Sequence, residues 1–433
     1  MRTFPQTYEQ EAIWIAEQFA GRPSPFLETW AQLIRGPLDV PALERAWAAL
    51  VARHPVLRTT FLLDDSGPVQ RVDPDLTVPL ERAAWPGGPL HDTLREEGRR
   101  PLDLTRAPAR LTLYDHGPRT HVLLLQIHHV AVDDASLVLL DHDLSALYTQ
   151  ETGGAPAELA APAVLLGEHA ARTRAAGIAA EDLDFWHAYL DGAAPLTHLP
   201  PHPRELPARR GTACGCVRAT LTPELGAAVR ATARTLRTTP HVLMSVCTAA
   251  LAAAPHGGDD IVLGTPVSRR GDPDLDDVFG CLTDLLPVRL TVPADATFDE
   301  VCSDTKRGLL QVLRHRQVPY GMLGGGVSRT RGVLSGAHLG RICLVLDEAP
   351  SRLDLPGLHC ERVHVGGAAA KFDWLQYVVA DGQGWEVRAD YACDYFTAEQ
   401  AATVLAQWTR ALEAVAQDPR IPVRALIQEL SAV

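Results

Sequence analysis

The chain has 433 residues, of which 46% are hydrophobic and 21% charged, so its composition is that of a globular protein long enough for two domains. Its formal net charge of −13 argues against nucleic acid as a partner. No apolar run reaches the length of a membrane span, and the N-terminus lacks the apolar core of a signal peptide, so we expect a cytoplasmic protein.

The first part of the chain alternates between helical and extended patterns. Tyr8, Ala12, Ile15 and Phe19 recur at the spacing of one helical face. Asp39 is placed to cap a second helix that begins at Pro41. The other elements expected here are a strand at 29–34, a strand leading to Phe61, strands near 110–114 and 121–128, and a helix at 137–148. A Pro/Gly-rich connection at 151–162 follows.

The second part repeats this alternation. The expected elements are a helix ending at Leu190, an extended segment at 212–221, helices at 223–236 and 240–254, and a strand at 261–264. Strand, helix, helix and strand in each part predict two similar α/β lobes, which we place at 1–175 and 176–433. The eight cysteines form no CxxC pair, so we expect reduced, mostly buried thiols rather than a zinc site.

Residues 126–134, Gln-Ile-His-His-Val-Ala-Val-Asp-Asp, are the most informative stretch of the chain. The apolar run before them predicts a buried strand that ends in His128 and His129, and Asp133 follows within one turn. Such a strand end places an imidazole in a cleft near a carboxylate, which suits acyl transfer. The neutral imidazole of His129 either accepts a proton from an attacking nucleophile or only orients it. On an extended segment His128 points the other way, so we expect a mainly structural role for it.

Seven segments, in order between about residues 5 and 419, resemble the sequence motifs of the condensation domains of nonribosomal peptide synthetases. Residues 128–134 resemble the third motif, HHxxxDG. The other matching segments are residues 7–14, 33–39 with 50–61, 183–190, 264–269 with 280–289, 318–320 and 371–373. One HHxxxD match alone is a weak signal, whereas seven matches in order make chance a poor explanation.

The resemblance implies a chloramphenicol-acetyltransferase-like α/β fold, a pseudodimer of two lobes in a V with a central tunnel. It implies an acyltransferase that joins a carrier-tethered acyl or aminoacyl thioester to an amine or a hydroxyl, giving an amide or an ester. A partner peptidyl or acyl carrier protein delivers the phosphopantetheine arm, so we expect no bound cofactor and no metal. The acceptor is a small molecule or is itself carrier-bound.

Two further expectations concern assembly. An acidic carrier protein would need a local basic patch on this acidic chain, such as Arg204, Arg209 and Arg210. The motifs begin close to Met1 and end near Val433, which leaves no room for an adenylation or carrier domain. We therefore expect a free-standing, monomeric condensation enzyme of antibiotic or other natural-product biosynthesis.

The resemblance also assigns roles to further residues. A buried Asp133 needs a partner for its charge, and the implied partner is Arg58 of the RHxxLRTxF-like segment. Asp134 replaces the final Gly of HHxxxDG, a position where Gly permits positive φ and where Asp tolerates it better than most residues. We expect Asp134 and Asp284 to line the substrate channel, while Trp374 suits the channel wall and the core equally.

Three alternatives stay open from the sequence. A condensation-like domain that has lost catalysis recruits carrier proteins or tailoring enzymes, and the change at Asp134 is compatible with such a loss. An epimerisation domain shares the HHxxxD motif. An acyltransferase that takes coenzyme A thioesters needs no carrier protein.

Overall fold

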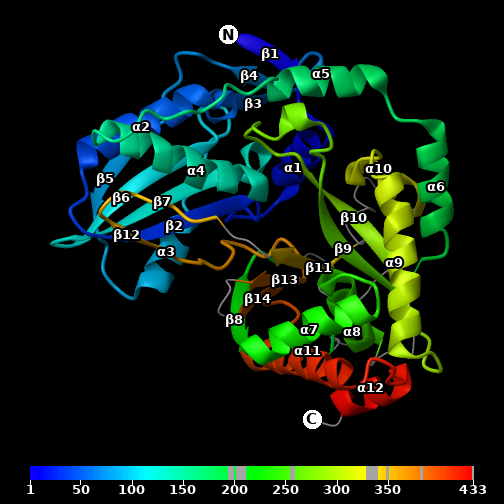
Figure 1. Ribbon diagram of the computed structural model, residues 1–433. Coiled ribbons are helices and arrows are strands. Elements are labelled where there is room, and N and C mark those ends of the chain that lie inside the picture. Colours follow the sequence, from blue (N-terminus) through cyan, green and yellow to red (C-terminus); the bar gives the residue numbers. More distant parts are fainter. Residues whose placement is uncertain are drawn as a thin grey trace. The chain divides into compact units, whose positions relative to one another are not determined.

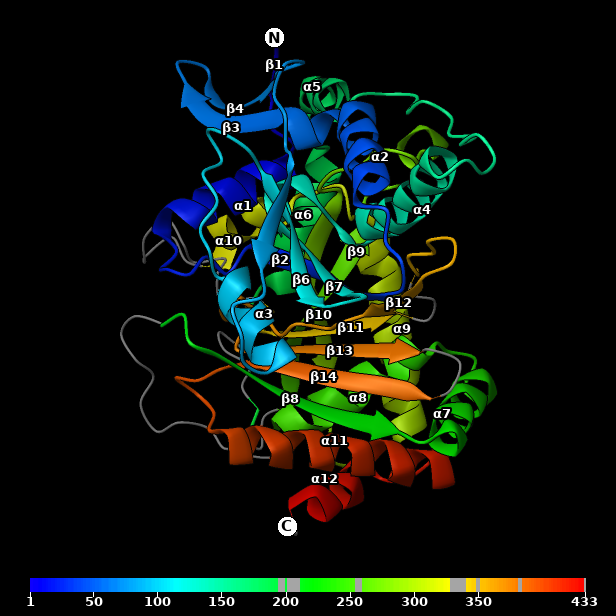
Figure 2. The ribbon, with the colours of Figure 1, turned by 90° about the vertical axis from the view of Figure 1, so that its left-hand side faces the viewer.

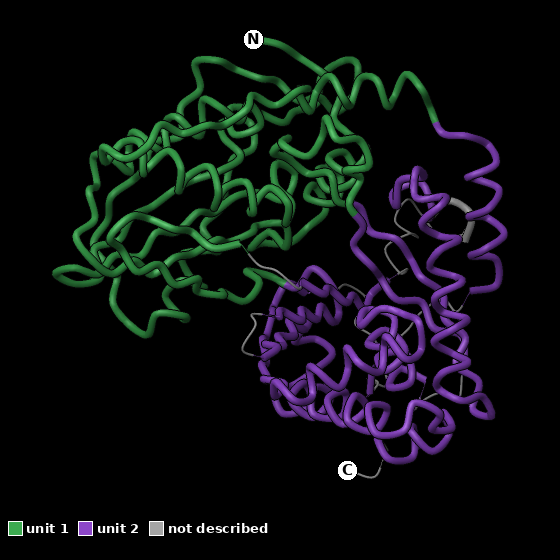
Figure 3. Tube along the Cα trace, viewed as in Figure 1, with its two compact units in different colours: residues 1–177, 268–283, 351–369 green, residues 178–267, 284–350, 370–433 purple. Residues whose placement is uncertain are grey.

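The computed structural model describes residues 1–193, 199–200, 211–253, 259–327, 340–347, 351–380 and 384–431. The expected basic patch of Arg204, Arg209 and Arg210 lies outside the described residues. The chain divides into two compact units, shown in Figure 3. Unit 1 comprises residues 1–177, 268–283 and 351–369, and unit 2 comprises residues 178–267, 284–350 and 370–433. Two segments of the expected second lobe thus belong to unit 1.

Unit 1 is built on two sheets (Figure 1). The larger sheet has the order β12-β2-β7-β6-β5 and the smaller has the order β1-β4-β3. The strands are β1 (Arg2–Pro5), β2 (Leu27–Arg35), β3 (Thr59–Asp64), β4 (Gly67–Val72), β5 (Leu80–Ala84), β6 (Ala109–Gly117), β7 (Thr120–His128) and β12 (His359–Arg362). The helices are α1 (Tyr8–Phe19), α2 (Val40–Arg53), α3 (Leu90–Gly98), α4 (Asp134–Glu151) and α5 (Leu166–Ala176), with short 3-10 helices η1 (Pro55–Arg58), η2 (His129–Ala131) and η3 (Pro273–Leu275).

Strand β7 lies in the middle of the larger sheet and is buried on both faces. Leu123 and Leu125 pack into the core formed with α2 and α4, whereas Val122 and Leu124 face a smaller core that includes Leu94 of α3. Figure 1 shows α2 and α4 on one side of this sheet and α3 on the other. Burial on both faces explains why the strand is a continuous apolar run rather than an alternating one. It also fixes the position at which the histidine pair leaves the sheet.

The helix starts in unit 1 follow their capping residues. The Asp39 side chain accepts a hydrogen bond from Ala42 N, as the expected cap of α2 requires. Thr7 and Gln10 form a reciprocal capping box at the start of α1. Helix α4 begins at Asp134, before the expected start at residue 137, because the side chain of Asp133 caps it.

Helices α2 and α4 are joined by a buried carboxylate, Asp143. One of its oxygens lies 2.7 Å from Arg53 Nε and 2.8 Å from His54 Nε2, and the other lies 2.9 Å from His142 Nδ1. Burial raises the pKa of Asp143, but the hydrogen bonds from His54, His142 and Arg53 outweigh burial and lower this pKa to about 2. The carboxylate is therefore ionised across the neutral range.

Asp143 gives the first prediction, which concerns acid stability. Because the pKa of Asp143 is lower in the folded than in the unfolded protein, its ionised carboxylate adds to the free energy of unfolding. This contribution is complete above about pH 4 and is lost as pH falls towards about 2. We expect the free energy of unfolding to fall over this window, and to fall less steeply in Asp143→Asn. Urea unfolding at a series of pH values measures both slopes, and equal slopes in the two proteins would refute the assignment.

Unit 2 is built on one sheet of order β10-β9-β11-β13-β14-β8. The strands are β8 (Cys214–Leu221), β9 (Asp260–Ser268), β10 (Thr283–Thr291), β11 (Ile342–Asp347), β13 (Trp374–Ala380) and β14 (Trp385–Ala392). The helices are α6 (Ala180–Leu190), α7 (Pro223–Thr235), α8 (Pro240–Ala253), α9 (Phe298–Arg314), α10 (Tyr320–Val327), α11 (Ala398–Gln417) and α12 (Val423–Ser431). The first residue of β10 and the last of β9 are counted with unit 1.

The core of unit 2 lies between its sheet and the helices α7, α8, α11 and α12. Helix α11 runs along β8 and β14, as Figure 2 shows. Trp374, Trp385 and Trp408 are all buried in this core. Trp374 is 1% exposed and its ring lies edge-on to Phe396 at 5.5 Å. Of the two positions that the sequence left open for Trp374, the structure shows the core.

None of the helices within the described ranges combines the length and the apolar character needed to cross a membrane.

Candidate active site

The histidine pair lies where β7 passes into α4 in unit 1. Strand β7 ends at His128, the single turn η2 begins at His129, and α4 begins at Asp134. The change from strand to 3-10 turn reverses the chain within a few residues and brings two successive side chains into different surroundings. This geometry agrees with the sequence analysis, which predicts a strand that ends in the two histidines and then turns through Asp133.

His129 is partly exposed, and both its backbone and its ring are held by hydrogen bonds. Its backbone N–H donates to Phe26 O at 2.8 Å, and its ring Nδ1 lies 2.8 Å from Val132 O. A carbonyl oxygen only accepts, so Nδ1 must carry the hydrogen. In the neutral imidazole the lone pair then resides on Nε2. The local hydrogen bond thus selects the tautomer whose outer nitrogen is a proton acceptor.

Cys281 is the side chain that sequence reasoning missed beside His129. Its Sγ lies 4.0 Å from His129 Nδ1, and the residue is fully buried. The segment that carries Cys281 belongs to the fifth resembling motif, but nothing in its composition indicates that it lies next to the histidine turn. Local sequence patterns therefore could not predict the contact between Cys281 and His129.

His128 is buried and has different contacts from His129. Its Nδ1 accepts a hydrogen bond from Val130 N at 3.2 Å, which caps the turn η2. Its Nε2 lies 3.5 Å from a carboxylate oxygen of Glu17. These contacts hold the turn in place, and the mainly structural role expected for His128 stays a prediction.

Asp133 has a buried carboxylate that holds the start of α4. The carboxylate accepts hydrogen bonds from the backbone and hydroxyl of Ser136, at 2.9 and 2.6 Å, and from Leu282 N at 2.9 Å. Both carboxylate oxygens also lie 2.9–3.0 Å from Nη2 of Arg270. The side chains of Asp133 and Arg270 are 0% and 7% exposed. The charge of Asp133 is therefore both paired and hydrogen-bonded, as a buried carboxylate requires.

The expected pair of Asp133 with Arg58 is wrong. The guanidinium of Arg58 donates to the carbonyls of Val51, Ala52 and Pro74. Val51 and Ala52 lie in the last turn of α2, where carbonyls lack helical partners and a cation is favourable. Arg58 thus caps the C-terminus of α2, and Arg270 is the cation that pairs with Asp133.

Segment 268–283 is bound to the histidine turn through more than the ion pair. Ser136 Oγ accepts from Gly280 N at 2.9 Å, and Arg270 also donates to the carbonyls of Leu275 and Val278. Gly280 has a φ of +153°, and a Cβ there would lie 2.4 Å from a methyl of Leu166. The positive φ favours glycine at this position, and a larger residue would also displace the Leu166 side chain.

Asp134 is exposed and is the first residue of α4. In the described part of the chain, Arg237 is the one non-glycine residue with a positive φ, so Asp134 does not need the left-handed conformation considered from the sequence. An acidic side chain in the first turn of a helix is favourable because it faces the positive end of the helix dipole. The replacement of Gly by Asp is thus compatible with an undistorted turn.

Asp284 belongs to unit 2 and is almost completely buried. Its two carboxylate oxygens accept hydrogen bonds from Leu285 N and from Tyr320 N, each at 2.9 Å. Tyr320 is the first residue of α10, so Asp284 stabilises the start of that helix. These contacts give Asp284 a structural role, and its place in a substrate channel stays a prediction.

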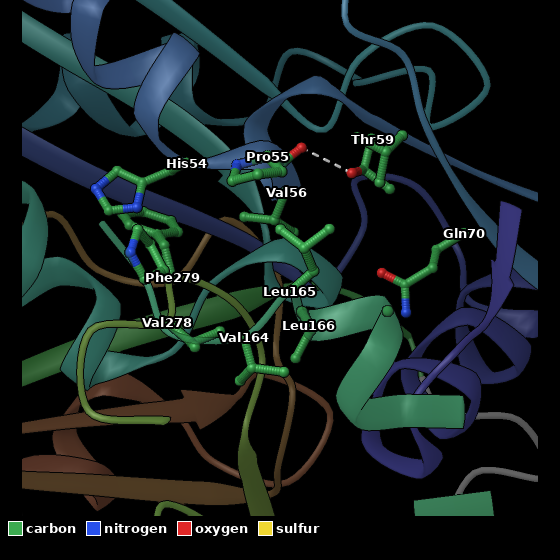
Figure 4. Close-up of a pocket in the computed structure, with 13 residues that line it drawn as sticks. His54, Pro55, Val56, Thr59, Gln70, Val164, Leu165, Leu166, Val278 and Phe279 are labelled. Atoms are coloured by element: carbon green, nitrogen blue, oxygen red, sulfur yellow. Dashed lines mark hydrogen bonds between the residues drawn. The ribbon is translucent and has the colours of Figure 1, made fainter. Parts of the chain in front are cut away.

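Unit 1 also contains a largely apolar cavity with an empty volume of about 370 Å³, part of it open to solvent (Figure 4). Its lining includes His54, Thr59, Gln70, Leu166 and Phe279. His54 is engaged with Asp143, and Thr59 Oγ1 donates to the carbonyl of Pro55 at 2.8 Å. The residues of the histidine turn do not line this cavity. Among the described residues, no cluster of three His, Cys, Asp or Glu side chains is arranged to bind a metal ion.

Comparison with known proteins decides the family. A family model described as Condensation domain matches residues 2–429. The chain belongs to the condensation-domain family. The histidine turn is therefore the HHxxxDG motif of a condensation domain, with Asp134 in place of the final Gly.

Relatives of this condensation domain include large peptide synthetases. The chain is 30% identical to phosphinothricin tripeptide synthetase PhsC of Streptomyces viridochromogenes, over 87% of this chain and 36% of that protein. It is 27% identical to the beauvericin nonribosomal cyclodepsipeptide synthetase of Gibberella fujikuroi, over 97% of this chain and 14% of that protein. The chain thus spans well under two thirds of these relatives.

A solved structure gives strong similarity in fold. In the complex of the X-domain and OxyB from teicoplanin biosynthesis, the matching chain superimposes with a TM-score of 0.84 and 27% identity. The match covers 98% of this condensation domain and 96% of that chain. The expected chloramphenicol-acetyltransferase-like α/β fold is confirmed, whereas the V of two lobes and its tunnel stay predictions.

Proposed function

We propose that this condensation domain joins a carrier-tethered acyl or aminoacyl thioester to an amine or hydroxyl acceptor. The observation that carries the proposal is the hydrogen bond from His129 Nδ1 to Val132 O, because it leaves Nε2 as a proton acceptor on a partly exposed ring. A general base of this kind typically accelerates proton transfer by roughly 10²–10⁴-fold. The synthetase relatives support the substrate class.

The proposed reaction requires no cofactor bound to this chain. The acceptor N–H or O–H donates a hydrogen bond to His129 Nε2, and its nitrogen or oxygen attacks the thioester carbonyl. His129 Nε2 takes the proton, and the tetrahedral intermediate collapses by breaking the C–S bond. The proton then passes from His129 to the leaving thiolate, which yields an amide or ester and the free thiol of phosphopantetheine on the carrier protein.

The proposal is tested by mass-spectrometric detection of product. Purified protein is incubated with a panel of acyl and aminoacyl thioesters on carrier proteins and with amine and alcohol acceptors, and His129→Ala is run in parallel. Coenzyme A thioesters of the same acyl groups form a second arm. Product from carrier-bound donors that is lost in His129→Ala supports the proposal. Product from coenzyme A thioesters alone would favour a carrier-independent acyltransferase.

A second candidate function is recruitment without catalysis. Two observations favour it, namely the similarity to an X-domain whose structure was solved in complex with OxyB, and Asp134 in place of Gly. On this alternative the chain binds a carrier protein or a tailoring enzyme, and that binding survives the loss of His129. Carrier binding in both proteins with no product from any donor and acceptor would favour recruitment.

Replacing Asp134 separates the two candidates further. Asp134→Gly is expected to leave the condensation rate within about two-fold and to lower the free energy of unfolding by about 1 kcal/mol, because glycine loses a favourable charge at the helix start and is more flexible when unfolded. Initial rates and urea unfolding measure the two effects. Activity that is absent in the natural sequence and restored in Asp134→Gly would show that Asp134 blocks catalysis.

A further inference from the structure

Helix α1 contacts the histidine turn at two places on one of its faces. Gln10 and Glu17 are about two helical turns apart, so their side chains lie on the same side of α1. Gln10 is fully buried, and its Nε2 donates to Val130 O at 3.1 Å. Glu17 Oε2 lies 3.5 Å from His128 Nε2. The helix therefore supports both the backbone of the turn and the histidine before it.

The contacts of His128 define its tautomer. The backbone N–H of Val130 only donates, so the Nδ1 atom that it contacts at 3.2 Å must hold a lone pair. The hydrogen of the neutral ring is then on Nε2, the atom that lies near Glu17. The distance of 3.5 Å is long for a hydrogen bond, but an anion still attracts an N–H dipole there, since burial lowers the local dielectric.

Glu17 is itself held in place and ionised. Ser24 Oγ donates to it at 2.5 Å, and Arg22 Nη1 lies 2.6 Å from its other oxygen. Burial raises the pKa of Glu17, but its contacts with His128, Ser24 and Arg22 outweigh burial and lower this pKa. The carboxylate thus keeps its charge at neutral pH.

A chain of contacts also joins Glu17 to His129. Ser24 Oγ, which donates to Glu17, accepts a hydrogen bond from Phe26 N at 3.1 Å. The carbonyl of Phe26 accepts the backbone N–H of His129 at 2.8 Å, and the ring of Phe26 lies 6.2 Å from that of His128. One carboxylate is therefore connected to both histidines of the motif.

We propose that Glu17 is a positioning residue of the condensation site. By attracting the Nε2 hydrogen of His128 it keeps Nδ1 free of hydrogen, so that Nδ1 accepts from Val130 N and closes the turn that presents His129. This inference rests on the proposed function for its kinetic consequence, whereas the tautomer of His128 is a property of the folded protein alone.

The first test is nuclear magnetic resonance of protein labelled with ¹⁵N at histidine. Signals of His128 are assigned by their loss in His128→Asn. We expect His128 to carry its hydrogen on Nε2, to keep this tautomer in Glu17→Gln, which retains an acceptor oxygen, and to show a mixture of tautomers in Glu17→Leu. Arg22→Ala is the matched control, because it removes a cation of Glu17 that is 66% exposed and leaves the carboxylate. An unchanged His128 signal in Glu17→Leu would overturn the inference.

The second test is a double-mutant cycle in kcat. Glu17→Leu is expected to lower kcat roughly ten-fold with little change in KM, because a small displacement of a reacting group is costly. Asparagine at position 128 keeps an acceptor for Val130 N but has no atom at the Nε2 position. In the His128→Asn background, Glu17→Leu should therefore change kcat by less than about two-fold. Equal effects in both backgrounds would contradict action through His128.

The two tests separate this inference from the proposed function. If no product forms but Glu17→Leu shifts the His128 tautomer as expected, the inference about Glu17 stands and the proposed function is wrong. If product forms but the His128 signal does not change in Glu17→Leu, the proposed function stands and the inference about Glu17 is wrong.

Discussion

Replacing His129 by alanine is expected to lower the rate of product formation by roughly 10²–10⁴-fold, the usual contribution of a general base. The physical reason is that Nε2 is the ring nitrogen with the lone pair, since Nδ1 donates to Val132 O. Binding of the carrier protein is expected to stay unchanged, because the imidazole acts on the acceptor. Single-turnover rates with a loaded carrier protein measure the chemical step apart from product release.

A matched control is available in His91, an exposed histidine of α3. His91→Ala is expected to keep the rate of the natural sequence. His129→Ala with an unaltered rate would remove His129 from the mechanism. A parallel loss of carrier binding would instead indicate that the substitution disturbs the fold of the turn.

Replacing Arg270 by leucine is expected to lower the free energy of unfolding by about 3–5 kcal/mol, the usual cost of leaving one partner of a buried ion pair alone. The estimate applies because Asp133 has no exposed side-chain surface and Arg270 contacts both of its oxygens. Arg270 also donates to backbone carbonyls of segment 268–283, which lose a donor in the variant. Urea unfolding gives the change in free energy.

Two comparisons make the Arg270 prediction specific. Arg307→Ala removes an ion pair with Asp304 that is about 70% exposed on both sides, and exposed pairs contribute little. The double variant Asp133→Leu with Arg270→Leu is expected to be less destabilised than the two single effects combined, because it removes the unpaired charge. A small effect of Arg270→Leu, similar to that of Arg307→Ala, would show that the pair is unimportant.

The Arg270 prediction also bears on how activity data are interpreted. Asp133 caps α4 directly behind the turn that carries His129, so a loss of Arg270 or Asp133 changes the position of that ring as well as stability. Lower activity in these variants is therefore expected without any chemical role for the ion pair. His129 variants of normal stability are the informative ones for catalysis.

Local patterns predicted the elements around the site well. The apolar run of β7, the histidines at its end and the capping residue Asp39 are all short-range signals, and each marks an element that the structure contains. The helix after the turn begins earlier than expected because Asp133 acts as its cap. Short strands such as β1 carry too few residues for a pattern and were not anticipated.

Long-range partners were not predictable in the same way. The motif resemblance predicts Arg58 as the partner of Asp133, but Arg58 lies beside the carbonyls at the end of α2. Arg270 is separated from Asp133 by more than one hundred residues, and no local spacing links them. Cys281 and Gly280 reach the turn with the same returning segment. Trp374 illustrates a related limit, since an aromatic residue has the same sequence signal in a core as in a channel wall.

The proposed function depends above all on His129, which is proposed to catalyse bond formation between a carrier-bound thioester and an acceptor. The most direct measurement is the single-turnover yield of product, by mass spectrometry, from the best donor and acceptor of the panel in the natural sequence and in His129→Ala, with carrier affinity determined for both. We expect product in the first, almost none in the second, and equal carrier affinities in both. Equal yields in the two proteins, or carrier binding in both with no product in either, would contradict it.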